Sequence, residues 1–186
     1  MRLSFLAAAA GLVTRATAWA RRNPLDTTDQ LQLDALAVAI NRDNDFTTLR
    51  WTARNTIVGA LTLRGKLIDE LVSKDIDLAV DELVFSAIQK AVKDDPTRSK
   101  VYSVNAPPRR IRSLELSVPG GRYSYDNPDC VYRTVPISDR YEYLVHGRRT
   151  APGPSDMTFS LISNPNSRGT VASLLGEDLV VRDDGT

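Results

Sequence analysis

The residues best placed to do chemistry form one short acidic bend, Asp126, Asn127, Pro128 and Asp129. Two carboxylates on either side of an Asn-Pro pair could bind a hard cation through their oxygens, or act together as a general acid and base. Asp and Asn side chains also accept hydrogen bonds from neighbouring amides, and proline fixes the backbone, so the same residues can simply form a turn. The bend supplies too few ligands for a metal cage, so we favour the turn and expect no metal site.

A second candidate is His146, the single histidine of the chain. A Ser-His-Asp relay would need this imidazole together with a serine such as Ser124 or Ser160. The sequence holds no Gly-x-Ser-x-Gly motif to present such a serine, and His146 is followed closely by Arg148 and Arg149. We therefore expect an imidazole at the surface or at the end of a strand rather than a general base.

A basic cluster, Arg109, Arg110 and Arg112, follows Pro107 and Pro108. Its guanidinium groups could grip a carboxylate or a phosphate. A solvated linker is the interpretation that we favour. The chain has no Gly-x-x-x-x-Gly-Lys-Ser/Thr motif, which argues against nucleotide binding.

The acidic bend also carries a family resemblance, together with residues 125–133, 141–149 and 178–185. These stretches resemble a microbial domain-of-unknown-function family whose members share an Asp-Asn-Pro-Asp-x-x-Tyr motif. The resemblance covers about residues 115–186, with a fainter similarity over 49–72, and implies a β-sandwich but no established reaction. Cys130 stands where threonine is common in that family. Members continue into further strands after the last Asp-Gly, so the resemblance implies a β domain that is incomplete at its C-terminus here.

Helical periodicity dominates the chain before Pro107. Thr27 and Gln30 have the spacing of a capping box, and apolar residues at intervals of three and four then predict amphipathic helices over about 33–40, 49–71 and 76–91. The last of these should end before Pro96, because the residue before proline avoids helical dihedral angles. We expect residues 21–98 to form a helical segment.

From residue 99 the apolar period falls to two, and turn residues recur at short intervals, which is typical of antiparallel sheet. We therefore predict an α+β protein in which the N-terminal helices pack on a C-terminal antiparallel β-sandwich or jelly-roll-like sheet, over residues 99–186. The expected strands are 100–104, 111–118, 131–137, 141–147, 157–163, 170–175 and 179–182.

Residues 1–20 have the pattern of a signal peptide, with Arg2 before a short apolar run and a small-x-small site that predicts cleavage after Ala20. The apolar run is interrupted by Arg15 and is far below the roughly 20 residues of a membrane span, so we expect no stable membrane anchor. Cleavage leaves 22 basic and 23 acidic residues, and this near-neutral balance argues against a broad nucleic-acid surface. We expect a secreted or secretory-pathway protein, and its single cysteine, Cys130, precludes an internal disulfide.

Two functions fit these patterns, and neither needs a cofactor. The first is a binding or accessory module for a small molecule or carbohydrate, with aromatic and polar contacts from Asn127, Tyr132, Arg133, Tyr141 and Tyr143. The alternative is a cofactor-independent, non-redox enzyme such as an isomerase, a cyclase or a hydrolase acting on a small organic substrate. In that enzyme Asp126, Asp129 and His146 would be the catalytic residues.

Overall fold

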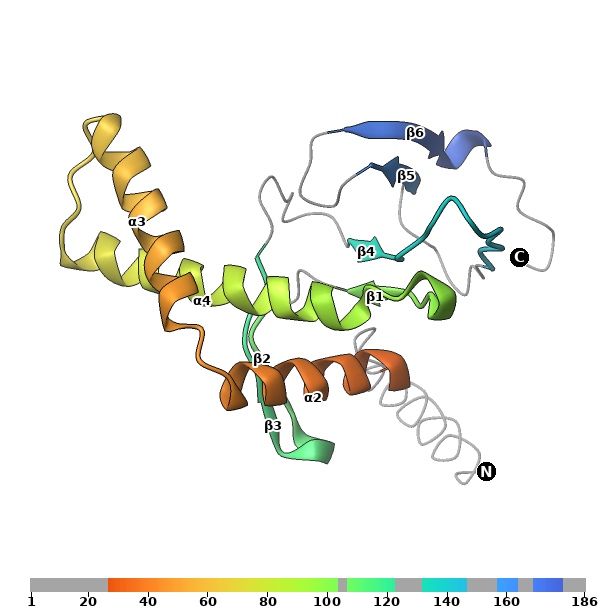
Figure 1. The fold of residues 1–186 in the computed structure, drawn as a ribbon, viewed down its shortest axis with the longest axis horizontal. Coiled ribbons are helices and arrows are strands. Elements are labelled where there is room, and N and C mark those ends of the chain that lie inside the picture. Colours follow the sequence, from red (N-terminus) through yellow and green to blue (C-terminus); the bar gives the residue numbers. More distant parts are fainter. Residues whose placement is uncertain (1–26, 104–106, 123–131, 147–156, 164–168, 179–186) are drawn as a thin grey trace, which may run out of the picture. The chain divides into compact units, whose positions relative to one another are not determined.

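The computed structural model describes residues 27–103, 107–122, 132–146, 157–163 and 169–178. By its internal contacts the chain divides into two compact units, Met1–Tyr141 and Glu142–Thr186. Helices come first and short antiparallel strand pairs follow, so the chain is an α+β protein (Figure 1).

The first described helix, α2, spans Thr28–Asp43 and begins at the predicted cap. The Thr27 hydroxyl accepts a hydrogen bond from the backbone N–H of Gln30 at 3.2 Å, which satisfies one of the free amides of the first turn. The Gln30 side chain does not return the bond to the backbone of Thr27. It turns into the interior instead, so only half of the predicted capping box forms.

The second helix, α3, spans Thr47–Leu63, and the single long helix expected over 49–71 is wrong. Gly65 has a φ of 67°, and the N–H groups of Gly65 and Lys66 donate to the carbonyls of Thr62 and Leu61 at 2.9 and 3.0 Å. These two bonds form a Schellman motif, which turns the chain away from the helix axis at a position that glycine adopts without strain.

The third helix, α4, spans Glu70–Lys93. The Asp69 carboxylate caps it by accepting from the N–H of Val72 at 2.8 Å, and Lys90 and Lys93 lie in the last turn, where cations interact favourably with the helix dipole. As predicted, the helix ends before Pro96, which begins the short 3-10 helix η1 (Pro96–Arg98).

The core of the first unit lies where α4 meets α2 and a strand pair (Figure 1). The C-terminal half of α4 packs along α2, and its N-terminal half packs along α3. Phe85 of α4 and Ala37 of α2 are fully buried at this junction. The other buried apolar members of this cluster are Ile76, Val80, Val84, Ile88, Ile111 and Val118.

Two short strand pairs complete the described part of the first unit. They join β1 (Tyr102–Ser103) to β4 (Arg133–Thr134) and β2 (Arg109–Ile111) to β3 (Leu116–Val118), both antiparallel. The strand expected over 111–118 is interrupted by the 3-10 turn η2 (Arg112–Leu114), because Glu115 adopts a left-handed conformation with φ of 49°.

The second unit contains one antiparallel pair among its described residues, β5 (Thr158–Ile162) with β6 (Thr170–Leu175), followed by the 3-10 turn η3 (Gly176–Asp178). The strand expected over 141–147 is absent from residues 141–146, and the expected strand 179–182 lies outside the described residues. The described pairs are all two-stranded.

Replacing the two glycines in or next to α3 with alanine should have opposite effects on the stability of the protein. Gly65→Ala should destabilise the protein by about 1 kcal/mol, because a Cβ is unfavourable in the left-handed conformation. Gly59→Ala should stabilise it by roughly 0.5–1 kcal/mol, because Gly59 lies in the helix interior with nothing within 4 Å of the added Cβ. Urea unfolding followed by circular dichroism measures both. Effects of the same sign at the two positions would contradict the assigned helix end.

Candidate ligand-binding site

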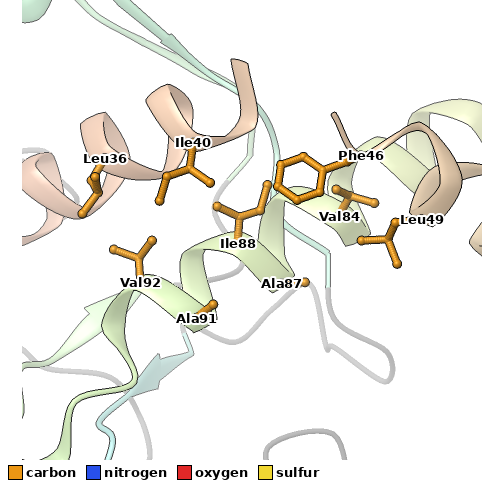
Figure 2. Close-up of a pocket in the computed structure, with 9 residues that line it drawn as sticks. All are labelled: Leu36, Ile40, Phe46, Leu49, Val84, Ala87, Ile88, Ala91 and Val92. Atoms are coloured by element: carbon orange, nitrogen blue, oxygen red, sulfur yellow. The ribbon is translucent and has the colours of Figure 1, made fainter. Parts of the chain in front are cut away.

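An open apolar groove of about 460 Å³ runs between α2 and α4 (Figure 2). Leu36 and Ile40 of α2 form one side, and Ile88 and Val92 of α4 lie opposite them. Phe46, in the α2–α3 connection, stands at one end of the groove. The remaining lining residues are Leu49, Val84, Ala87 and Ala91.

Two of the residues that line the groove are small side chains of α4. Ala87 and Ala91 are one helical turn apart on the same face and are both exposed. Because both positions line the groove, a larger residue at either one would reduce its open volume. Leu36, on the α2 side of the groove, is 51% exposed, although it lies only one residue from the fully buried Ala37.

The groove can bind a ligand only through apolar contacts of its side chains. Every side chain that lines it is aliphatic or aromatic, and none carries a titratable or hydrogen-bonding group. Its volume lies within the range of about 300–1,000 Å³ that is typical of small-ligand sites. The lining can therefore bind an apolar group, but it offers no acid, base or nucleophile.

A buried polar cluster lies on another face of α2 and holds the helices and strands in place. The Asp34 carboxylate is fully buried and accepts hydrogen bonds from the side-chain amides of Gln30 and Gln89 at 3.2 and 2.9 Å. It is also ion-paired with the guanidinium of Arg109. Gln30 in turn donates to the carbonyl of Ser103 at 3.1 Å and accepts from its N–H at 2.7 Å. The cluster thus joins α2 to α4, β1 and β2.

The electrostatics of this cluster are those of a structural site. Burial raises the pKa of Asp34 above its usual value, and the charge of Arg109 with the hydrogen bonds from Gln30, Arg109 and Gln89 opposes that rise. The Arg109 side chain is only 11% exposed, and its Nε and Nη1 have no hydrogen-bond partner among the described residues. The expectation of a solvated arginine linker is therefore wrong for Arg109, whereas Arg110 and Arg112 are exposed.

Among the described residues of the first unit, Lys93 is also a buried charge. Its ammonium group contacts the hydroxyl of Thr134 in β4, and the residue is only 8% exposed. Burial, together with the nearby charge of Lys90, lowers the pKa of Lys93 to about 8, with Asp94 opposing the shift. Lys93 follows Val92 in sequence but does not line the groove.

The acidic bend predicted from the sequence, with Asp126, Asn127 and Asp129, lies outside the described residues. The predicted cleavage site after Ala20 lies outside them as well.

The remaining predicted residues fall in both units. Arg133 lies opposite Ser103 in the β1–β4 pair and donates from Nη1 to the Ser103 hydroxyl at 3.1 Å, which places it beside the buried cluster. Tyr132 precedes it and is partly exposed, and Tyr141 ends the first unit. Tyr143 and His146 belong to the second unit, where His146 is exposed.

Neither the groove nor the buried cluster was predicted from the sequence, although the sequence contains a signal for each. Gln30 and Asp34 lie four residues apart on the helix face that also carries Leu33 and Ala37, so polar residues interrupt an otherwise apolar stripe. Ala87 and Ala91 mark a one-turn interval of small residues on the apolar face of α4. Neither signal identifies the partner elements, which lie far along the chain.

Comparison of the chain with protein-family models, with curated protein sequences and with solved structures finds no match. Within the described ranges no helix is long and apolar enough to cross a membrane. Nor do those ranges bring three or more His, Cys, Asp or Glu side chains together in a group that could hold a metal ion. The site must therefore be interpreted from its own geometry.

The buried ion pair predicts a pH-dependent cost of losing Arg109. Arg109→Met should destabilise the protein by about 3–5 kcal/mol at about pH 7, because the Asp34 carboxylate is left buried without a counter-charge. Loss of Arg109 should raise the Asp34 pKa further, so protonation relieves the penalty as the pH falls. Urea unfolding at about pH 7 and pH 4.5 measures the change. Arg110→Met, at an exposed position, serves as the control and should stay within about 0.5 kcal/mol. A penalty that grows toward acid pH would contradict this description of the cluster.

Replacing Lys93 should change stability with a pH dependence opposite to that of the Arg109 replacement. Its folded-state pKa is depressed, so burial of the charged form costs stability below about pH 8, and this cost disappears as the pH rises toward the unfolded value of 10.5. Lys93→Met should therefore stabilise the protein by about 2 kcal/mol at about pH 7, with a gain that shrinks above about pH 9. The exposed Lys74→Met variant is the matched control. A gain that does not depend on pH would show that the charge of Lys93 is not the cause.

Proposed function

We propose that this protein is a non-catalytic binding module of the secretory route, whose helical unit holds the apolar part of a ligand in the groove between α2 and α4. The observation that carries this proposal is the groove itself, which is open and wholly apolar in its lining side chains. Burying an apolar ligand surface there is favourable by roughly 25 cal/mol per Å² removed from water. The secretory location rests on the signal-peptide pattern of residues 1–20.

The lining narrows the ligand class. A carbohydrate needs hydrogen-bond partners for its hydroxyls, and leaving buried hydroxyls unpaired is costly. The groove side chains supply no such partners, so we propose an aliphatic chain rather than a sugar. We propose that a single acyl chain lies along the groove, between Leu36 and Ile40 on one side and Ile88 and Val92 on the other (Figure 2).

The enzyme alternative would need Asp126, Asp129 and His146 in one pocket. Asp126 and Asp129 lie outside the described residues, so no observation supports that arrangement. For the strand region we propose the β-sandwich or jelly-roll of the family that residues 115–186 resemble. The antiparallel strand pairs are what supports this part of the proposal.

A fluorescent fatty acid, such as a dansyl-labelled undecanoic acid, tests the groove directly. We expect saturable binding to the full chain with enhanced dansyl emission. Ala87→Phe and Ala91→Phe should each raise the dissociation constant at least tenfold, about 1.4 kcal/mol, because the added ring fills the hollow. Ala60→Phe is the matched control, since Ala60 is an exposed alanine of α3 outside the groove lining, and it should leave binding unchanged.

Circular dichroism spectra and unfolding midpoints of the three variants must match those of the parent protein for this comparison to isolate the groove. The proposal fails if the parent protein does not bind the probe. It fails equally if both filled variants bind the probe as tightly as the parent.

A further inference from the structure

The connection between α3 and α4 exposes three leucines, which we call the leucine tip. Leu63, the last residue of α3, is 90% exposed, Leu67 in the connection is 92% exposed, and Leu71 in the first turn of α4 is 69% exposed. The connection lies at the end of the helix pair that is remote from the strands of the first unit (Figure 1). Single exposed leucines are common on protein surfaces, but three of them within nine residues are a concentration that marks an interaction site.

The apolar neighbours of the tip leucines face the core instead. Leu61, Ile68 and Val72 alternate with them along the chain and pack against the core cluster of the first unit. The Schellman motif at Gly65 also satisfies two of the last carbonyls of α3 within the turn itself. Backbone groups that are already hydrogen-bonded can leave water at a lower cost. The turn therefore presents leucine side chains outward on a backbone that is partly satisfied.

Two cations lie between the first two leucines of the tip. Arg64 and Lys66 are exposed, and neither side chain has an ion-pair or hydrogen-bond partner among the described residues. Other cations of these two helices are neutralised. Arg50, Arg54 and Lys74 form ion pairs with acids of α4 at 2.8, 2.7 and 2.7 Å.

The acids closest to the tip in sequence are occupied. Asp69 caps α4 by accepting from the N–H of Val72 at 2.8 Å, and it lies at the positive end of the helix dipole. Glu70 pairs with Lys74, one turn along the helix. The next acid, Asp75, lies more than a turn further along α4. The charge that stays available at the tip is therefore that of its two cations.

We infer that the leucine tip inserts into the surface of a lipid bilayer whose headgroups are anionic. The bilayer interface favours apolar side chains beside long basic ones, because the leucines enter the acyl boundary while Arg64 and Lys66 reach the negative headgroups. Each basic residue near such a surface adds to the attraction. A fluid bilayer adapts to a projecting tip, whereas a protein partner would need a pocket for each anchoring leucine.

The contact should be weak and reversible. A single modest apolar anchor gives only marginal membrane binding, and stable binding takes a second signal such as basic charge. Binding should therefore need both the leucines and the cations, and it should weaken as salt screens the charges. This inference does not rest on the ligand groove. A single fatty-acid molecule offers no surface for the tip, and vesicle binding is measured without fatty acid.

Co-sedimentation of the full chain with phospholipid vesicles tests the leucines. We expect the parent protein to bind phosphatidylcholine vesicles that contain phosphatidylserine, and to bind pure phosphatidylcholine vesicles more weakly. The double variant Leu63→Ser/Leu67→Ser should lower the partition coefficient on the anionic vesicles by about tenfold or more. Leu114→Ser, at an exposed leucine of η2 that lies well away from the tip in Figure 1, is the control and should bind as the parent does.

A second pair of variants tests the charge. Arg64→Gln/Lys66→Gln should weaken binding to the anionic vesicles by about tenfold or more and should remove most of its salt dependence. Arg110→Gln/Arg112→Gln, which removes two exposed cations elsewhere, is the matched control and should keep both the affinity and the salt dependence. All of these positions are exposed, so the circular dichroism spectra should match that of the parent.

A local signal places the contact, because residues 1–20 include an apolar run of their own. A spin-labelled phospholipid in the vesicles should broaden the methyl resonances of Leu63, Leu67 and Leu71 and leave those of Leu114 sharp. A parent protein that does not bind anionic vesicles would overturn the inference, whether the second unit or another protein covers the tip. Binding that is indifferent to Leu63→Ser/Leu67→Ser, or broadening confined to methyls outside the tip, would overturn it equally.

Discussion

The buried carboxylate of Asp34 is the constraint on which the rest of the first unit depends. A charge removed from water must be met by hydrogen bonds or by an opposite charge, and Asp34 recruits both from three separate elements. Gln30 lies on its own helix, Gln89 on α4 and Arg109 on β2. Because each donor has to reach the same carboxylate, the relative positions of α2, α4 and β2 are restricted. A purely apolar contact would tolerate sliding of one helix along the other.

This restriction explains why the groove stays open. The interface between α2 and α4 is fully packed at Ala37 and Phe85, and Asp34 and Gln89 are bonded beside that packed region. On the neighbouring face Leu36 and Ile40 of α2 lie opposite Ile88 and Val92 of α4, and Ala87 and Ala91 extend the apolar lining (Figure 2). A mobile pair of helices would collapse into such a hollow. Fixed by the polar cluster, the helices leave an apolar surface available for a ligand.

The sequence predicted the ends of helices better than their packing. The cap at Thr27 and the end of α4 before Pro96 follow from local rules, because the atoms concerned lie within a few residues of one another. The break at Gly65 was missed because apolar residues continue at helical intervals on both sides of it. The strands were predicted too long, since the left-handed Glu115 interrupts an alternating stretch that has no glycine at that position.

The Asp34 cluster and the groove were not predicted, and the reason differs from that for the helix and strand ends. Asp34 is 55 residues from Gln89 and 75 from Arg109, so its burial depends on contacts that no local pattern reports. The same holds for the groove, whose two sides come from separate helices. The acidic bend and His146 are the conspicuous features of the sequence, because such residue types are common in active sites. The two alanines that line the groove, Ala87 and Ala91, belong to a residue type that usually signals nothing more than packing.

The central claim is that the space between α2 and α4 is where a ligand binds. Intermolecular nuclear Overhauser effects between an unlabelled fatty acid and the methyl groups of the isotope-labelled full chain test it most directly. The account predicts contacts from the acyl chain to the methyls of Leu36, Ile40, Ile88 and Val92, with none to Leu63 or Leu78, which are exposed elsewhere on the helices. Contacts confined to methyls outside the groove, or an acyl chain that contacts none, would contradict it.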